Sequence, residues 1–89
     1  MSEGEDDRPS VAEGLDIHEV DDGFVVYDPT NDRVHYLNPT ATVILSFCDG
    51  IRPVTELAEV VRAAWQLEAP PTEEVAACVA QLRHEGVLR

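Results

Sequence analysis

The two cysteines are the side chains of this chain best suited to nucleophilic or redox chemistry. Cys48 and Cys78 lie far apart in the sequence and form no Cys-x-x-Cys pair, which is the spacing typical of redox and zinc sites. We therefore expect each to be a small buried hydrophobic residue. A disulfide between them and a reactive thiol are the two alternatives.

The other ionisable side chains form no catalytic pattern. The three histidines show no metal-ligand spacing, and they are His18, His35 and His84. Acidic residues cluster in the first fourteen residues, at Asp21-Asp22 and at Glu73-Glu74. Solvation, hairpin geometry and the helix dipole explain these clusters. The sequence also has no glycine-rich phosphate loop and no supported Ser-His-Asp set. We expect no enzyme activity, no metal and no cofactor.

Composition points to a small acidic domain. The chain has 89 residues and a formal net charge of −12, from 18 acids against 6 basic residues, all of them arginine. A DNA-binding protein neutralises phosphates with Lys and Arg, so a basic peptide or protein surface is the more natural partner. No apolar run approaches the ~20 residues of a membrane helix, and the N-terminus lacks signal-peptide features. We expect a cytoplasmic protein with no membrane or nucleic-acid partner.

The chain divides into a tail and one domain. Residues 1–14 are acidic and without periodicity, which predicts a disordered tail. Residues 15–89 are the predicted domain. Its first half contains three apolar segments at 15–20, 24–27 and 33–37, joined by Asp21-Asp22-Gly23 and by a turn from Asp28 to Asp32. Two tight hairpins predict an antiparallel meander, in which the third strand is an edge.

Three helices are predicted after the sheet. Asn38 and Pro39 are an N-cap and a first helical residue, and the first helix is apolar on two sides up to Gly50. A second apolar stripe runs from Val54 to Trp65, and a third helix runs from Thr72 to Gly86. The sequence thus predicts an α+β, winged helix-turn-helix fold, with a three-stranded antiparallel sheet followed by three helices.

The third strand is the candidate binding surface. Within Val34 to Leu37 it carries no lysine, proline or bulge signal, and only Arg33 guards its start. Edge strands usually carry such protection, and an open apolar edge can accept an extended peptide as a further strand. The alternatives are that a helix or the C-terminal tail covers this edge, or that it dimerises.

Several short motifs resemble the PqqD-like family. They are Leu37-Asn38-Pro39-Thr40-Ala41, Asp49-Gly50 and Glu85-Gly86-Val87-Leu88, and the likeness extends over residues 15–89. One departure is Pro53, where the family tends to have a small hydroxyl cap. The resemblance implies a winged-helix module that recognises leader peptides in the biosynthesis of ribosomally made, modified peptides.

The family likeness also implies a site, in the groove between the third strand and the third helix. Its predicted residues are Arg33, Val34, His35, Tyr36 and Leu37 on the strand, and Val75, Ala76, Val79, Leu82 and Arg83 on the helix. Ala76 would leave room for a peptide side chain, and Arg83 would meet a leader carboxylate. Some of the three aliphatic helix residues must belong to the core, and the sequence does not divide them.

The implied function is a standalone module that presents a precursor peptide to a separate modifying enzyme. That enzyme could be a radical S-adenosylmethionine enzyme, a leader protease or a cyclodehydratase. Two other interpretations remain open: a winged-helix DNA-binding regulator, and a small adaptor that dimerises through its edge strand. The first needs a basic recognition helix, but the third helix has one arginine and three glutamates at its ends.

Overall fold

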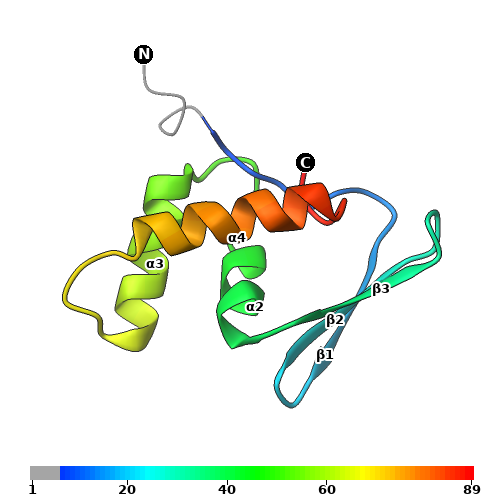
Figure 1. Cartoon of the computed structure of the whole chain (residues 1–89), viewed down its shortest axis with the longest axis horizontal. Coiled ribbons are helices and arrows are strands. Elements are labelled where there is room, and N and C mark those ends of the chain that lie inside the picture. The colour runs from blue at the N-terminus through cyan, green and yellow to red at the C-terminus, as the bar shows by residue number, and fades with distance from the viewer. Residues whose placement is uncertain (1–6) are drawn as a thin grey trace.

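The computed structural model describes residues 7–89. Three strands are followed by three helices (Figure 1), and these are β1 (Asp16–Val20), β2 (Gly23–Asp28), β3 (Arg33–Leu37), α2 (Pro39–Ser46), α3 (Val54–Trp65) and α4 (Thr72–His84). This order confirms the predicted α+β fold, a three-stranded antiparallel sheet followed by three helices.

The sheet is an antiparallel meander with β2 in the middle. In its register Val26 lies between Ile17 and His35. The turn from β2 to β3 is fixed by Asp28, whose carboxylate accepts hydrogen bonds from the backbone and side-chain nitrogens of Asn31. These bonds hold the pKa of Asp28 below its ordinary value. Because β2 is the middle strand, β3 is an edge strand, as predicted.

The helix starts follow local chemistry. Asn38 caps α2 by accepting a hydrogen bond from the Ala41 backbone nitrogen at 2.8 Å, with Pro39 in the first helical position. Helix α3 begins after Pro53, which offers no side-chain cap. Helix α2 ends at Ser46, before Gly50, and Gly50 instead joins a loop in which its nitrogen donates to the Pro9 carbonyl.

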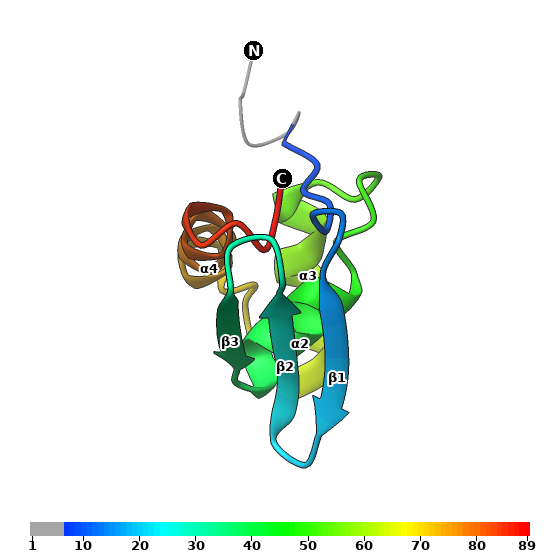
Figure 2. The same ribbon diagram turned by 90° about the vertical axis from the view of Figure 1, so that its right-hand side faces the viewer.

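Helix α2 packs on one face of the sheet, and α3 and α4 pack against α2 to complete the core (Figure 2). Alternation along β2 and β3 directs Val26 and Leu37 inward, where they meet the apolar stripes of the helices. The buried apolar residues are Val26, Leu37, Ala41, Ile44, Leu45, Cys48, Val54, Leu57, Ala58, Val61, Val75, Val79, Leu82, Val87 and Leu88.

The predicted disordered tail needs correction from residue 7 onward. Residues 7–12, the N-terminal segment, run beside the C-terminal residues (Figure 1), and Val11 bridges to Leu88. Pro9 is fully buried, and the Ser10 carbonyl accepts from the Arg89 nitrogen at 2.8 Å. This docking uses mainly backbone hydrogen bonds, which leave no periodic apolar pattern. The first six residues of the predicted tail lie outside the described residues.

Candidate functional site

Strand β3 has one edge without a strand partner in residues 7–89. It pairs with β2 on its other side, and no other described element forms a backbone–backbone hydrogen bond with Val34, His35 or Tyr36. The side chains of Arg33, His35 and Leu37 lie on the helix-covered face of the sheet. Those of Val34 and Tyr36 lie on the opposite face.

Helix α4 lies on the β3 side of the sheet, where Figure 2 shows it nearly end-on, and in Figure 1 its direction is roughly opposite to that of β3. At the start of β3, Arg33 shares a polar pocket of about 250 Å³ with His84 and Glu85 at the end of α4. Beyond the end of β3, Thr40 shares an apolar pocket with the first turn of α4. No Cα atom of β3 comes within 8 Å of one in α4. We use the name β3–α4 groove for the strip between these two elements, which has a pocket near each end.

Helix α4 has a buried core stripe, a stripe on the β3 side and an opposite flank. The core stripe is buried and consists of Val75, Val79 and Leu82, so all three undecided aliphatic residues belong to the core. Glu85 lies near His35, and Glu74 lies near Thr40. Cys78 and Gln81 lie between Glu74 and Glu85 at helical spacing, so all four share one side of α4. The groove-facing stripe is therefore Glu74, Cys78, Gln81 and Glu85.

Ala76 and Arg83 lie on the opposite flank of α4, so their predicted place opposite β3 is corrected. Both line a pocket with Asp7 and Val54. The Arg83 guanidinium forms a bidentate pair with the Asp7 carboxylate, with Nη1 2.7 Å from Oδ2. This pair holds the pKa of Asp7 below and that of Arg83 above its ordinary value. Arg83 thus already has a carboxylate partner within the chain.

His35 stands at the boundary between the core and the groove. Its side chain is 9% exposed, and Nδ1 lies 4.0 Å from Glu85 Oε1, beyond hydrogen-bond length. Its Nε2 atom is buried and has no hydrogen-bond partner in the described residues. Of the predicted strand residues, Arg33 and His35 are the two that meet the end of α4.

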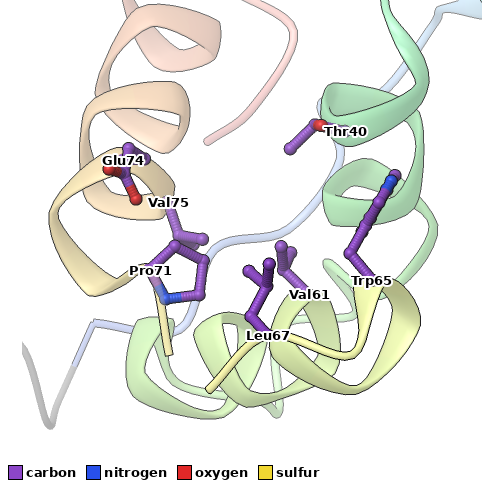
Figure 3. Close-up of a pocket in the computed structure, with 7 residues that line it drawn as sticks. All are labelled: Thr40, Val61, Trp65, Leu67, Pro71, Glu74 and Val75. Atoms are coloured by element: carbon purple, nitrogen blue, oxygen red, sulfur yellow. The ribbon is translucent and has the colours of Figure 1, made fainter. Parts of the chain in front are cut away.

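The apolar pocket has a volume of about 310 Å³ (Figure 3). Its lining comes from the starts of α2 and α4, the end of α3 and the loop between α3 and α4. The lining residues are Thr40, Val61, Trp65, Leu67, Pro71, Glu74 and Val75. Periodicity predicted Trp65 on the buried face of α3, but 42% of it is exposed. It forms a side wall of this pocket instead.

Sequence reasoning missed the groove-facing stripe and the pocket. The signal for the stripe was present, because residues 74, 78, 81 and 85 repeat at helical spacing beside the core stripe. The residues of the pocket come from four separate parts of the chain, and no local pattern links them.

Neither cysteine is placed for nucleophilic chemistry. Burial raises the pKa of the Cys48 thiol to about 12, and burial followed by the charge of Glu85 raises that of Cys78. Both are free thiols, and Cys48 Sγ donates to the Ile44 carbonyl at 3.0 Å. This agrees with the predicted buried hydrophobic residue for Cys48, whereas Cys78 is half-buried in the groove-facing stripe.

Residues 7–89 hold no group of three or more His, Cys, Asp or Glu side chains arranged to bind a metal ion. Within the same residues, no helix has the length and apolar character needed to cross a bilayer.

Together the geometry defines a small α+β module with an open edge strand beside a helix. The family model described as coenzyme PQQ synthesis protein D (PqqD) matches residues 23–88, and the chain belongs to this family. A solved structure, lasso peptide synthetase B1 complexed with the leader peptide, has a similar fold, with a TM-score of 0.76 and 19% identity, over 92% of this chain and 98% of that one. No curated protein sequence matches the chain.

Proposed function

We propose that this chain binds the leader of a ribosomally made precursor peptide, which adds as an antiparallel strand to β3 in the β3–α4 groove. The observation that carries this proposal is the open edge of β3, next to a groove with a pocket at each end. The leader peptide complexed with lasso peptide synthetase B1 supports the same class of ligand, as does membership of the PqqD family.

Antiparallel addition gives the bound peptide a direction. Strand β3 runs from the polar pocket at Arg33 toward the apolar pocket at Thr40, so the peptide runs from the apolar pocket to the polar one. Its backbone pairs with β3, and alternate side chains point toward α4. The leader therefore leaves the groove beside His84 and Glu85.

The apolar pocket is the anchor for a large apolar side chain near the N-terminal end of the paired segment. Trp65 and Leu67 remain 42% and 39% exposed in the free protein. A peptide side chain between them would bury its own apolar surface and that of both residues. Burial of apolar surface is the usual source of affinity at a binding hot spot.

The electrostatics of the groove favour a leader with basic residues. Glu74 and Glu85 stand at the two ends of the groove-facing stripe, and the whole chain has a net charge of −12. Such a field accelerates the approach of a basic peptide and depends on ionic strength.

The role that follows is to deliver a substrate, with the chemistry performed elsewhere. A bound leader raises the local concentration of the precursor near a separate modifying enzyme. That enzyme is a radical S-adenosylmethionine enzyme, a leader protease or a cyclodehydratase.

Two substitutions on α4 test the site. Gln81 is exposed on the groove-facing stripe, whereas Ala80 is exposed on the opposite flank with Ala76 and Arg83. Gln81→Trp fills the groove and should weaken binding of a fluorescent leader peptide tenfold or more, about 1.4 kcal/mol. The peptide is the leader segment of any short precursor reading frame found among the neighbouring genes, and binding is followed by fluorescence anisotropy.

Ala80→Trp is the matched control, because it adds the same side chain to the flank of α4 opposite the groove-facing stripe. It should leave leader affinity unchanged, and both variants should keep the melting temperature within a few degrees. Equal affinity of the Gln81→Trp variant and the parent would contradict the groove. The alternative of a dimerising adaptor requires that the protein self-associates through the edge of β3 and that blocking this edge abolishes self-association. Sedimentation velocity tests this requirement.

A further inference from the structure

The outer face of the sheet is apolar although no described segment covers it. In Figure 2 no helix passes in front of the three strands, and helix α2 lies behind them. A water-facing antiparallel sheet normally shows polar side chains on that side. Here the outward positions are largely aliphatic or aromatic.

The register places these apolar residues next to one another. Tyr27 lies opposite Val34, and Val25 lies between Tyr36 and His18, the one imidazole on this face, with Val20 at the end of β1. Four of them rank among the exposed large hydrophobic residues, from Tyr27 at 37% to Tyr36 at 80%. We define the outer sheet face as Val20, Val25, Tyr27, Val34 and Tyr36. A contiguous apolar surface of this kind marks an interaction site.

Acidic side chains surround this face. Asp16 lies opposite Tyr27 on β1, and the two hairpin turns add further exposed acids. The acidic rim is Asp16, Asp21, Asp22 and Asp32. A second copy docked face to face would bring two acidic rims together, which is unfavourable. The fitting partner has an apolar centre ringed by Lys and Arg.

Peptide capture would enlarge the same surface. A strand added to β3 contributes its outward side chains to the outer sheet face, because alternate residues of every strand share one side. A protein docked on this face would therefore contact the captured leader as well as the module. The modifying enzyme is the partner that must recognise both.

We propose that the outer sheet face is the docking surface for the modifying enzyme, which meets it with an apolar patch ringed by basic residues. This inference rests on the proposed function. Leader binding and enzyme docking then use opposite sides of one sheet, with β3 common to both.

Two substitutions reduce the apolar area of the outer sheet face and spare the groove. Val20→Thr and Tyr27→Thr lie on β1 and β2, away from the free edge of β3, and threonine keeps a high preference for strands. The probe is a radical S-adenosylmethionine enzyme, leader protease or cyclodehydratase found among the neighbouring genes, and biolayer interferometry measures its binding to the leader-loaded protein. The double variant should bind this enzyme at least tenfold more weakly, with leader affinity unchanged.

Matched control variants show whether an effect is specific to the outer sheet face and its acidic rim. Ile51→Thr changes a residue that is 70% exposed but lies outside the sheet, and it should have no effect. Asp16→Lys on the rim should slow enzyme association, whereas Glu56→Lys on α3 should not.

The docking surface is wrong if the leader-loaded double variant binds the enzyme like the parent, or if the parent does not bind it. It is also wrong if the parent dimerises and the double variant does not, because the face then joins two copies. These outcomes leave the groove intact as long as leader affinity persists. Failure of the leader to bind the parent would instead refute the proposed function.

Discussion

Arg83 pairs with a carboxylate, as its chemistry predicted, but the carboxylate belongs to the chain itself. From sequence, a lone arginine on the third helix predicted a carboxylate ligand from a leader peptide. The structure gives it a carboxylate from Asp7, 76 positions earlier in the chain. The resulting pair fastens the N-terminal segment to α4 and gives Arg83 a carboxylate partner within the chain.

The Asp7–Arg83 pair makes stability depend on pH. Because the pKa of Asp7 is lowered from 3.8 in the folded protein, its contribution is complete above that value and is lost as the pH falls through the lowered pKa. Both side chains are about one-third exposed, so solvent limits the contribution. Asp7→Asn should cost at most about 1 kcal/mol at pH 7 and nothing in strong acid.

Urea unfolding at several pH values measures this difference. Glu13→Gln is the matched control, because Glu13 and Arg89 form an ion pair 3.6 Å apart that is mostly exposed, and its loss should have no measurable effect. An Asp7→Asn variant as stable as the parent at pH 7 would show that the pair adds nothing.

Among the elements, the junction of β2 with β3 and α2 depends on Gly23. The Asp-Gly pair predicted a hairpin, but the structure adds a second requirement. Gly23 has a φ of +148°, and a Cβ atom there would collide with the Leu37 carbonyl oxygen and stand 2.7 Å from Thr42 Oγ1. The glycine therefore permits close approach of the end of β3 to β2.

Gly23→Ala should destabilise the fold more than Gly86→Ala. Gly86 has a φ of +81° and open space around it, so alanine there costs about 1–2 kcal/mol of backbone strain. Alanine at position 23 adds overpacking, about 1–3 kcal/mol. Chemical denaturation of both variants compares them, and equal losses would mean that the contact with Leu37 relaxes without cost.

The elements themselves could be predicted because their signals are local. Asn38 caps α2 and the two turns define the meander, so the strands and helices follow the sequence closely. The flanks of α4 could not be assigned, because periodicity identifies the core stripe Val75, Val79 and Leu82 but not which neighbouring stripe faces β3. The docking of residues 7–12 depends on backbone hydrogen bonds to distant segments, which side-chain patterns do not encode.

For the whole molecule, charge separates the peptide-binding interpretation from the DNA-binding one. The chain has 18 acids and 6 basic residues, and α4 has Glu73 and Glu74 in its first turn. We expect no measurable binding to mixed-sequence duplex DNA at near-physiological salt, as followed by fluorescence anisotropy. Micromolar binding with a steep salt dependence would favour the regulator instead.

The central claim is that a leader peptide occupies the β3–α4 groove, and amide-shift mapping by NMR tests it most directly. On titration with the leader, the largest changes should fall on residues 33–38 and on Glu74, Cys78, Gln81 and Glu85. Ala76 and Ala80, on the opposite flank of α4, should change little. Changes centred instead on that flank, or on the exposed face of α3 around Glu56 and Glu59, would contradict the account.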